Sequence, residues 1–490
     1  MEEYFRIRQE KLEKIKELGV DIYPYSFDKT HNFDEIIDKY KDLPEAEFES
    51  LTDEFRVAGR IITVRKMGKS SFVHLYDGTA KLQVYIRKDK VEELDYDVFK
   101  LLDIGDIVGV AGNLFRTRTG ELTILVSKLT LLTKSFHPLP EKWHGLQDKE
   151  LRYRQRYLDL IVNEDTRRIF NLRSDIIQQI RMFFYERGFK EVETPMMQPI
   201  AGGAAARPFV THHNALDIPL FLRIAPELYL KRLLVGGMEK VFEINRNFRN
   251  EGVSQMHNPE FTMIEWYQLY IDYNDNINLT EELLSVLNEK FLENDTIEWD
   301  GKEISMKTPF ARKRFMDLIS EKSGVPVDDL WDEEKLKAHI QENMKEEECP
   351  PTYGKMLELM FDVYAEPSLV NPTFVTDYPV EISPLSKVSR KNKRETERFE
   401  LFVGGMEIAN GFSELNDPID QRGRFEAQLV DREKGDDEAT EMDHDFLNAL
   451  EHGMPPASGE GVGIDRLVML YTGARSIKEV ILFPLLRTKA

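Results

Sequence analysis

The chain of 490 residues contains a single cysteine, Cys349. One cysteine excludes a disulfide within the chain and a zinc site built from several cysteines. Its surroundings, rich in glutamate and proline, favour an unreactive thiol over a nucleophile. The sequence also lacks the run of roughly 18 apolar residues that a membrane-spanning helix needs. Residues 1–19 are charged throughout and contain no apolar signal-peptide core, so we expect a cytoplasmic protein without a membrane partner.

Several catalytic patterns are missing as well. None of the ten histidines belongs to a His-Glu-x-x-His motif or to a Cys/His cluster, which argues against a zinc site. No Ser–His–Asp set can be argued from spacing. The glycines of residues 459–463 follow the pattern G-x-G-x-G, not G-x-G-x-x-G, so a dinucleotide-binding Rossmann domain is not indicated.

The net charge of −22 argues at first against binding of nucleic acid. Net charge, however, describes solubility and the long-range field, whereas nucleic-acid binding needs only a local basic patch. The segment Phe55–Lys90 contains nine Lys or Arg residues and two Asp residues, a local balance of +7. This segment is therefore a candidate nucleic-acid surface within an acidic protein.

The region 55–133 alternates apolar and polar residues in short segments separated by turn signals such as Asp77-Gly78. This pattern predicts a small β-barrel, and an oligonucleotide-binding (OB) barrel is the best candidate. A barrel with another function would show the same strands, but the basic first half favours binding. The predicted strands are Phe55–Val64, Ser71–Leu75, Lys81–Ile86, Ile107–Phe115 and Leu122–Leu132.

The remaining chain suggests a helix at 1–19, a linker at 134–150 and a larger domain from 151 to 490. In the larger domain, Ser174 is a candidate N-cap of a helix, and Pro226 opens another helix. Residues of about 274–350 look helical and acidic, as in an insertion. Strands and helices mix without a regular βαβ rhythm, which predicts an α+β fold with an antiparallel sheet.

Two short segments carry the pattern most typical of a nucleotide site. In the first, Phe248–Glu251, the residues Arg249 and Glu251 are two apart and share a face if the segment is a strand. A guanidinium can clamp phosphate or carboxylate, and a carboxylate can accept from the amine of adenine. In the second, Gly459–Arg466, alternating glycines let a ligand approach the backbone, and Arg466 can reach that ligand. For either segment alone, an ordinary Arg–Glu surface pair explains the residues equally well.

The strand period places Phe261, Met263, Glu265 and Tyr267 on one face of the segment Phe261–Tyr267. That face begins with an aromatic ring and ends with a carboxylate and a phenol, about 13 Å further along at the usual rise. An adenine on the ring and an amino acid at the carboxylate fit this span. A half-buried strand with a solvent-facing glutamate is the alternative.

Glu407 and Glu414 are candidate oxygen ligands for Mg²⁺. A spacing of seven does not place both carboxylates on one face of a strand, so a bend at Gly411 is required to bring them together. Two exposed acids are the alternative.

Together and in this order, the two nucleotide segments resemble motifs 2 and 3 of class II aminoacyl-tRNA synthetases, and Arg187–Met197 resembles motif 1. The resemblance to class II lysyl-tRNA synthetases spans about residues 1–490. It includes APELYLKR, FRNEG, HNPEFTM, NPTFVTDYPVEISPL and NGFSELNDP. The family's fold implies an N-terminal helix and OB-fold anticodon-binding domain at 1–133, the linker 134–150, and a catalytic domain at 151–490 with an antiparallel sheet flanked by helices.

The resemblance also implies substrates, partners and residue roles. The substrates are L-lysine, ATP and lysine tRNA, the metal is Mg²⁺, and the assembly is a homodimer formed through motif 1. Catalysis would rest on Arg249 and Arg466. Residues implied for ATP are Arg249, Glu251, His257, Asn258, Phe261, Glu407 and Arg466. Residues implied for lysine are Gly203, Glu227, Arg249, Glu265, Tyr267 and Asn410. Those implied for Mg²⁺ are Glu407 and Glu414, and those for the anticodon are Arg65, Phe72 and Gln83.

Three alternatives stay open. Close relatives that use aspartate or asparagine share the motifs, but Glu265, Tyr267 and Glu227 suit a cation rather than a carboxylate. An enzyme that lysylates a protein would share the catalytic domain but lack the N-terminal barrel. An inactive paralogue acting as a scaffold would have lost Arg249, Arg466 or the acids, all of which are present.

Overall fold

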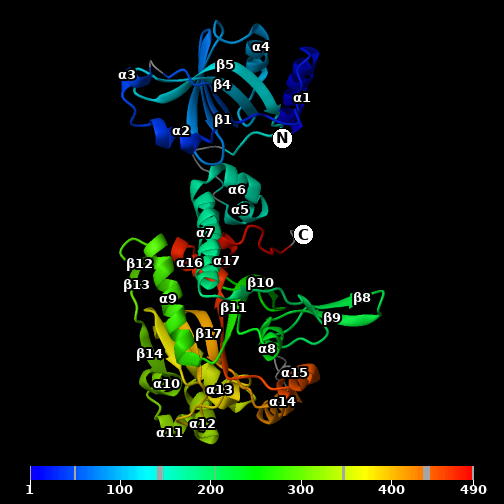
Figure 1. The fold of residues 1–490 in the computed structure, drawn as a ribbon, viewed down its shortest axis with the longest axis vertical. Coiled ribbons are helices and arrows are strands. Elements are labelled where there is room, and N and C mark those ends of the chain that lie inside the picture. The colour runs from blue at the N-terminus through cyan, green and yellow to red at the C-terminus, as the bar shows by residue number, and fades with distance from the viewer. Residues whose placement is uncertain are drawn as a thin grey trace. The chain divides into compact units, whose positions relative to one another are not determined.

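The computed structural model describes residues 2–48, 51–140, 146, 148–204, 206–344, 348–433 and 442–487. The chain folds as two compact units, residues 1–164 and 165–490 (Figure 1). No helix among the described residues is long and apolar enough to cross a membrane.

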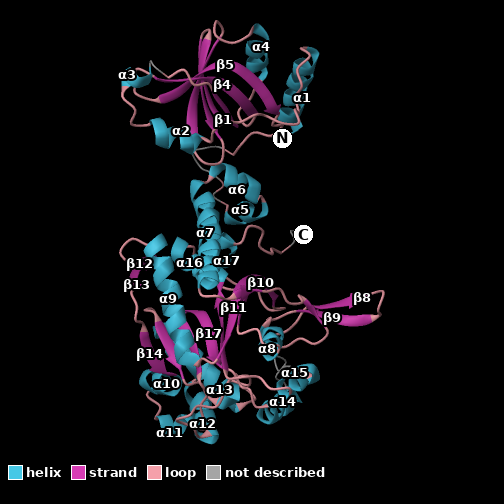
Figure 2. Ribbon diagram, viewed as in Figure 1, coloured by secondary structure: helices cyan, strands magenta, loops and turns pink. Residues whose placement is uncertain are grey.

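The first unit is built around a closed five-stranded barrel with the strand order β1-β2-β3-β5-β4 (Figure 2). Neighbouring strands are antiparallel except β3 and β5, which are parallel. All five strands predicted from the alternating pattern are present, and their inward residues form one apolar core. The strands are β1 (Phe55–Met67), β2 (Ser70–Tyr76), β3 (Lys81–Arg87), β4 (Ile107–Arg116) and β5 (Leu122–Thr133).

Short helices complete the first unit. Helix α1 buries Leu12 and Ile15 and ends just before Gly19, whose φ of 77° is typical of a glycine that terminates a helix. Of the predicted linker 134–150, residues 141–145 and 147 lie outside the described part of the chain. The helices are α1 (Glu2–Glu17), α2 (Phe33–Tyr40), α3 (Glu45–Phe48), α4 (Glu93–Leu101), α5 (Lys149–Arg154) and α6 (Arg156–Val162).

The second unit is centred on an eight-stranded sheet with the order β14-β15-β16-β17-β18-β11-β10-β6. All neighbours are antiparallel except the outermost pair at each edge, β14–β15 and β10–β6. The predicted α+β fold with an antiparallel sheet is therefore confirmed. The strands are β6 (Lys190–Glu191), β10 (Lys240–Phe248), β11 (Glu260–Leu269), β14 (Ala311–Arg314), β15 (Thr373–Thr376), β16 (Arg398–Val403), β17 (Met406–Ser413) and β18 (Ala457–Gly463).

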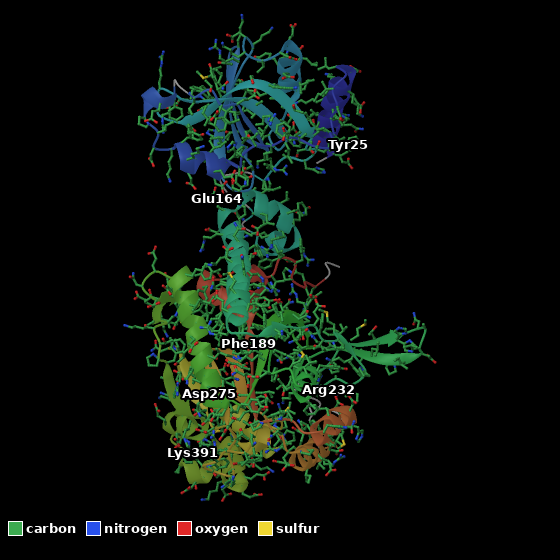
Figure 3. The ribbon with its side chains drawn as sticks, viewed as in Figure 1. Tyr25, Glu164, Phe189, Arg232, Asp275 and Lys391 are labelled. Atoms are coloured by element: carbon green, nitrogen blue, oxygen red, sulfur yellow. The ribbon has the colours of Figure 1, made fainter. Side chains whose placement is uncertain are left out.

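One face of this sheet is covered by α7, α9 and α16 (Figure 2). Ile264 and Trp266 point into that core, and so does Phe189, which follows α7 and is labelled in Figure 3. Because side chains alternate along a strand, Glu265 and Tyr267 belong to the opposite face. The helices of the unit are α7 (Glu164–Glu186), α8 (Glu227–Val235), α9 (Tyr273–Phe291), α10 (Phe315–Ser323), α11 (Val327–Leu330), α12 (Glu333–Asn343), α13 (Tyr353–Met360), α14 (Pro418–Glu433), α15 (His444–Glu451), α16 (Ile464–Thr472) and α17 (Ile477–Val480).

Two small sheets lie beside the large one. The first contains β7 (Met197–Gln198), β9 (Ile218–Leu222) and β8 (Val210–His213), in that order. The second is the hairpin of β12 (Thr296–Trp299) and β13 (Lys302–Ser305).

The structure differs from the sequence prediction in two places. Helix α7 starts at Glu164, ten residues before the expected cap Ser174, because Ile169 and Leu172 extend its apolar stripe onto the core. The segment 274–350 is only partly helical, since it also contains β12, β13 and β14. The turn between β12 and β13 is Asp300-Gly301, whose φ angles of 52° and 68° suit a two-residue hairpin.

Candidate active site

A cavity of about 920 Å³ opens over the face of the large sheet that faces away from α7, α9 and α16. Its floor comes from β11, β17 and β18, and its walls include the start of α8 and the loop that follows β10. Residues from both nucleotide segments and from the predicted lysine pocket line this one cavity. Segments more than 200 residues apart in the chain thus meet at one place.

The glycines of β18 form the floor of the cavity. Gly459, Gly461 and Gly463 pair across the sheet with Tyr267, Glu265 and Met263 of β11. A Cβ atom on Gly459 would lie 2.1 Å from the Tyr267 ring, and one on Gly461 would lie 2.9 Å from the Met263 methyl group. The space above this strand therefore exists because the three positions carry no side chain.

Glu265 lies buried at one end of the cavity. Its carboxylate accepts a hydrogen bond of 3.1 Å from the Tyr267 hydroxyl. Burial raises the pKa of Glu265 to about 8, and the nearby charge of Glu227 adds to the rise. A positive ligand group at this position would restore the ionised form.

Glu227 lines the same end of the cavity, and Glu414 lies next to it; both share one partner, Lys231. The Lys231 ammonium lies 2.5 Å from a carboxylate oxygen of each residue. Burial raises the pKa of Glu414 to about 8 and also raises that of Glu227, while Lys231 opposes both shifts. Gly203, with a φ of 90°, lies against Glu227, because a Cβ atom there would be 3.2 Å from the Glu227 Cβ.

Arg249, Asn258 and Phe261 gather in another part of the cavity. The Arg249 guanidinium lies 5.2 Å from the centre of the Phe261 ring. Its Nε atom and the Oδ1 atom of Asn258 are buried and have no hydrogen-bond partner among the described residues. Glu251 also lines this part of the cavity and is exposed. Buried polar atoms without partners are what a bound polar ligand would satisfy.

Arg466, His257 and Glu407 form a third group. Arg466 donates to the Glu407 carbonyl oxygen at 2.7 Å and lies 3.3 Å from its carboxylate. It also donates to Nε2 of His257 at 3.1 Å. Arginine can only donate, so Nε2 of His257 accepts this hydrogen bond and carries no proton. This agrees with the pKa of His257, which burial and the charge of Arg466 lower.

The predicted pair of metal ligands, Glu407 and Glu414, is not brought together. Strand β17 continues through Gly411, which pairs with Phe399 on one side and Glu460 on the other, and the irregularity in its pairing with β16 falls at Ile408 instead. Seven residues of strand span roughly 20 Å. Glu407 therefore belongs to the Arg466 group and Glu414 to the Lys231 group, and the pairing expected from sequence is corrected.

The carboxylate that accompanies Glu407 is Glu400 of β16. Burial raises the pKa of Glu400 to about 7; Arg398 opposes this rise and Glu407 adds to it. Glu400 accepts from the Tyr378 hydroxyl at 2.8 Å, from Arg398 at 2.6 Å and from the Asn410 amide at 3.1 Å. No sequence motif marks Glu400, although Gly404-Gly405, with φ angles of 63° and 74°, signals the hairpin that joins β16 to β17.

The three predicted anticodon residues lie on the barrel of the first unit. Arg65 pairs across the sheet with Phe72, and Phe72 pairs with Tyr85. The Phe72 and Tyr85 rings stack with centres 4.4 Å apart and planes 19° apart. Gln83 is buried, two residues before Tyr85 on β3. Tyr85 was missed by the sequence analysis, and the strand period could have found it, because it shares a face with Gln83.

The chain matches two family models. Residues 148–487 match the tRNA synthetases class II (D, K and N), and residues 55–132 match the OB-fold nucleic acid binding domain. A lysine–tRNA ligase of Carboxydothermus hydrogenoformans is 52% identical over 490 residues, covering 100% of this chain and 99% of that protein. A lysine–tRNA ligase of Bacillus subtilis is 49% identical over 492 residues, covering 100% and 98%. The barrel is thus an OB fold, and the chain belongs to the class II tRNA synthetases (D, K and N), within the lysine–tRNA ligase family.

Proposed function

We propose that the chain is a lysine–tRNA ligase, which activates L-lysine with ATP to lysyl-adenylate and transfers the lysyl group to the 3′ end of lysine tRNA. One observation carries the proposal: a single cavity is lined by the buried carboxyl groups of Glu227 and Glu265 at one end and, elsewhere along its wall, by arginines that include Arg249 and Arg466. The acids suit a substrate with ammonium groups, and the arginines suit phosphates and a carboxylate. The names of the relatives agree with this assignment.

The acidic end would bind lysine. Gly203 and Glu227 would meet the α-amino group, and Glu265 and Tyr267 would meet the side-chain ammonium. Glu414 would also meet the side-chain ammonium, because it lies beside Tyr267. Both side chains approach Gly459 so closely that a Cβ atom on this glycine would touch each of them. An aspartate pocket would need cations turned toward the substrate.

Asn410 lies in the same row of the sheet as Glu265, across Gly461. Its amide is bonded to Glu400 and its oxygen accepts from Arg398. We therefore assign Asn410 the task of holding these two charged groups at the border of the lysine pocket.

The arginine groups would bind ATP. Arg249 would bridge the α-phosphate and the lysine carboxylate, and its unpartnered Nε leaves a donor for this contact. Phe261 and Arg466 would sandwich the adenine ring, and Glu251 would accept from its amine. His257 and Asn258 would lie near the phosphates and the adenine.

Mg²⁺ would accompany ATP, and the residues present fit such an ion. Magnesium in nucleotide sites is commonly held by one or two carboxylates together with the phosphates. Glu400 and Glu407 supply such a pair; burial and the neighbouring Glu407 raise the pKa of Glu400, and a bound cation would favour its ionised form. When bound, the ion would neutralise charge on the phosphate oxygens.

The chemistry needs no nucleophile from the protein. The lysine carboxylate attacks the α-phosphorus of ATP in line, and pyrophosphate leaves. A hydroxyl at the 3′ end of the tRNA then attacks the lysyl carbonyl, and AMP leaves. Arg249 and Arg466 hold the reacting groups in place and stabilise negative charge on the phosphate, so that positioning and electrostatics supply the catalysis.

The two units would divide the work. Residues 1–133 would read the anticodon, 134–150 would act as a linker, and 151–490 would catalyse both steps. Unpaired anticodon bases would stack on Phe72, with Arg65 and Gln83 nearby. Such an enzyme of translation would work in the cytoplasm.

The catalytic unit would form a homodimer through its motif 1 segment. Large apolar side chains are exposed there, which is typical of a surface that a partner covers. They are Met182 and Tyr185 on α7 and Met196 and Met197 near β7.

Lysine-dependent exchange of pyrophosphate into ATP tests the assignment, with aspartate and asparagine as competing substrates. Exchange with lysine alone supports it, and exchange with aspartate or asparagine instead would overturn the specificity. No exchange with any amino acid would favour the inactive scaffold. Charging of lysine tRNA then separates the ligase from an enzyme that lysylates a protein.

A further inference from the structure

Lys231 is a fully buried lysine beside the proposed lysine pocket. It lies on α8 one turn after Glu227, next to Arg232, which is labelled in Figure 3. Its ammonium joins this helix to Glu414, which follows β17, and lies 5.2 Å from the centre of the Phe412 ring. Burial alone would lower the pKa of Lys231, but Glu227 and Glu414 outweigh it and raise the pKa, so Lys231 keeps its charge.

The ionisable groups around Lys231 have a simple balance of charge. Glu227, Glu265 and the Tyr267 phenol line this end of the cavity, and Glu414, directly behind the lining, interacts with all three. Among the described residues, Lys231 is the one cation within ion-pair distance of these carboxyl groups. Arg223 and Arg398 act on Glu265 and Glu227 from farther away.

Bound ammonium groups favour the ionised form of all three carboxyl groups, and the cluster then carries three negative charges and the one positive charge of Lys231. A lysine substrate brings two ammonium groups, which match the excess of negative charge. An amino acid with one ammonium group would leave one carboxyl group without a cation, and that group would either stay ionised at a cost or keep its proton and contribute little to binding.

We propose that Lys231 is a positioning residue that makes the pocket selective for a diamino acid, because it fixes the separation of Glu227 and Glu414 and favours the ionised form of both. The inference rests on the proposed function. Glu227 lies beside Gly203 and Glu414 lies beside Tyr267, so one side chain connects the groups for the two ends of the substrate. Lys231 itself would not touch lysine.

The consequence of losing this ammonium follows from electrostatics. Two buried carboxylates without a shared cation repel, and each raises the other's pKa until one holds a proton. A protonated carboxyl binds an ammonium group weakly and accepts a neutral side chain more readily. The pocket would then lose much of its preference for lysine.

Lys231→Met tests the proposal, since it removes the charge and keeps a long side chain. Pyrophosphate exchange is measured against pH with lysine and with 2-aminoheptanoic acid, in which a methyl group replaces the side-chain ammonium. We expect the lysine KM to rise about tenfold or more, as one pKa unit implies, and the preference for lysine to fall by a similar factor. The pH profile of kcat/KM should also move to higher pH, and Lys231→Arg should restore part of the preference.

Lys134→Met is the matched control. Lys134 is equally buried and pairs with Asp103 at 2.6 Å and Asp106 at 2.7 Å in the barrel. Its loss should lower the Tm but leave the lysine KM, the preference and the pH profile of exchange unchanged. Should Lys231→Met fail to fold, Lys231→Gln removes the charge while keeping a hydrogen-bond donor, and the same shifts are expected.

The experiment distinguishes a failure of this inference from a failure of the proposed function. If the Lys231 variants lose stability but keep the wild-type KM, preference and pH profile, Lys231 is only structural and the inference is overturned. If the wild type shows no exchange with lysine, the proposed function itself fails.

Discussion

Replacing Glu265 by glutamine removes an ionisable carboxyl group, and with it the negative charge available to a bound ammonium group, with almost no change in side-chain size. Glu265 is 5% exposed, so its interaction with a bound ammonium would be little screened by water. Loss of a charged partner from a buried ammonium costs roughly 2–4 kcal/mol, which is on the order of 30- to 700-fold in affinity. We expect Glu265→Gln to weaken lysine binding within this range and to change ATP binding little.

The size of this effect should depend on pH. Because the pKa of Glu265 is raised to about 8, the free wild type holds a proton there at pH 7, and lysine must displace it. One pH unit below the pKa, that displacement costs about 1.4 kcal/mol. Wild-type affinity for lysine should therefore rise between pH 6 and pH 8, and the difference from Glu265→Gln should grow over the same interval.

Calorimetric titration with lysine in buffers of different ionisation heat measures both the affinity and the released proton. The KM values for lysine and ATP in pyrophosphate exchange provide the comparison between the two substrates. An unchanged lysine affinity in Glu265→Gln would remove Glu265 from the pocket. An equal loss for lysine and ATP would mean that the substitution disturbs the whole cavity.

Four further outcomes are expected. Phe72→Ala should remove a stacking surface worth about 1–3 kcal/mol, which raises the KM for tRNA and leaves pyrophosphate exchange intact; loss of exchange would contradict a role in the anticodon domain. Gly459→Ala should abolish lysine activation, because the new Cβ would lie 2.1 Å from the Tyr267 ring, and near-normal activity would show that the strand yields. Light scattering should give about twice the chain mass of 57.2 kDa, and the single-chain mass would refute the homodimer. In the absence of lysine, the wild type should lose stability as the pH rises from 4.5 to about 8. The reason is that Glu265 ionises near pH 4.5 in the unfolded chain but only near pH 8 in the folded protein. Glu265→Gln lacks the contribution of Glu265 to this loss, while Glu414 and Glu400 still contribute theirs, so its curve of Tm against pH should be shallower; parallel curves for the two proteins would contradict the raised pKa of Glu265.

The barrel was predictable because each of its strands carries its own signal. The alternation of apolar and polar residues and the intervening turns are local properties, and the five predicted strands agree with the observed ones to within a few residues at each end. The β12–β13 hairpin was missed because it is short and surrounded by acidic helices. Its signal, Asp300-Gly301 between Trp299 and Lys302, is local as well, and only the helical pattern around it obscured it.

The part of the site that lies on one strand was also predictable. Glu265 and Tyr267 are two residues apart on β11, so the strand period alone places them on one face, and the structure shows them in contact. Glu400 and Lys231 were not predictable in this way. Their importance arises from pairing between elements: Glu400 meets Glu407 across a hairpin, and Lys231 meets Glu414 across the gap between α8 and β17.

Glu407 and Glu414 show why residue type and spacing do not assign a role. Both are glutamates of one short segment, and in the sequence either is an equally good magnesium ligand. Glu407 lies near the start of β17 and Glu414 just after its end, so the strand carries them roughly 20 Å apart at the usual rise and places one beside Arg466 and the other beside Lys231. The first environment contains an arginine and a second carboxylate, which suits phosphates and a cation. The second is buried and closed by a lysine, which suits an ammonium group. The surroundings that the fold provides, and not the residues themselves, therefore decide which substrate each carboxylate serves.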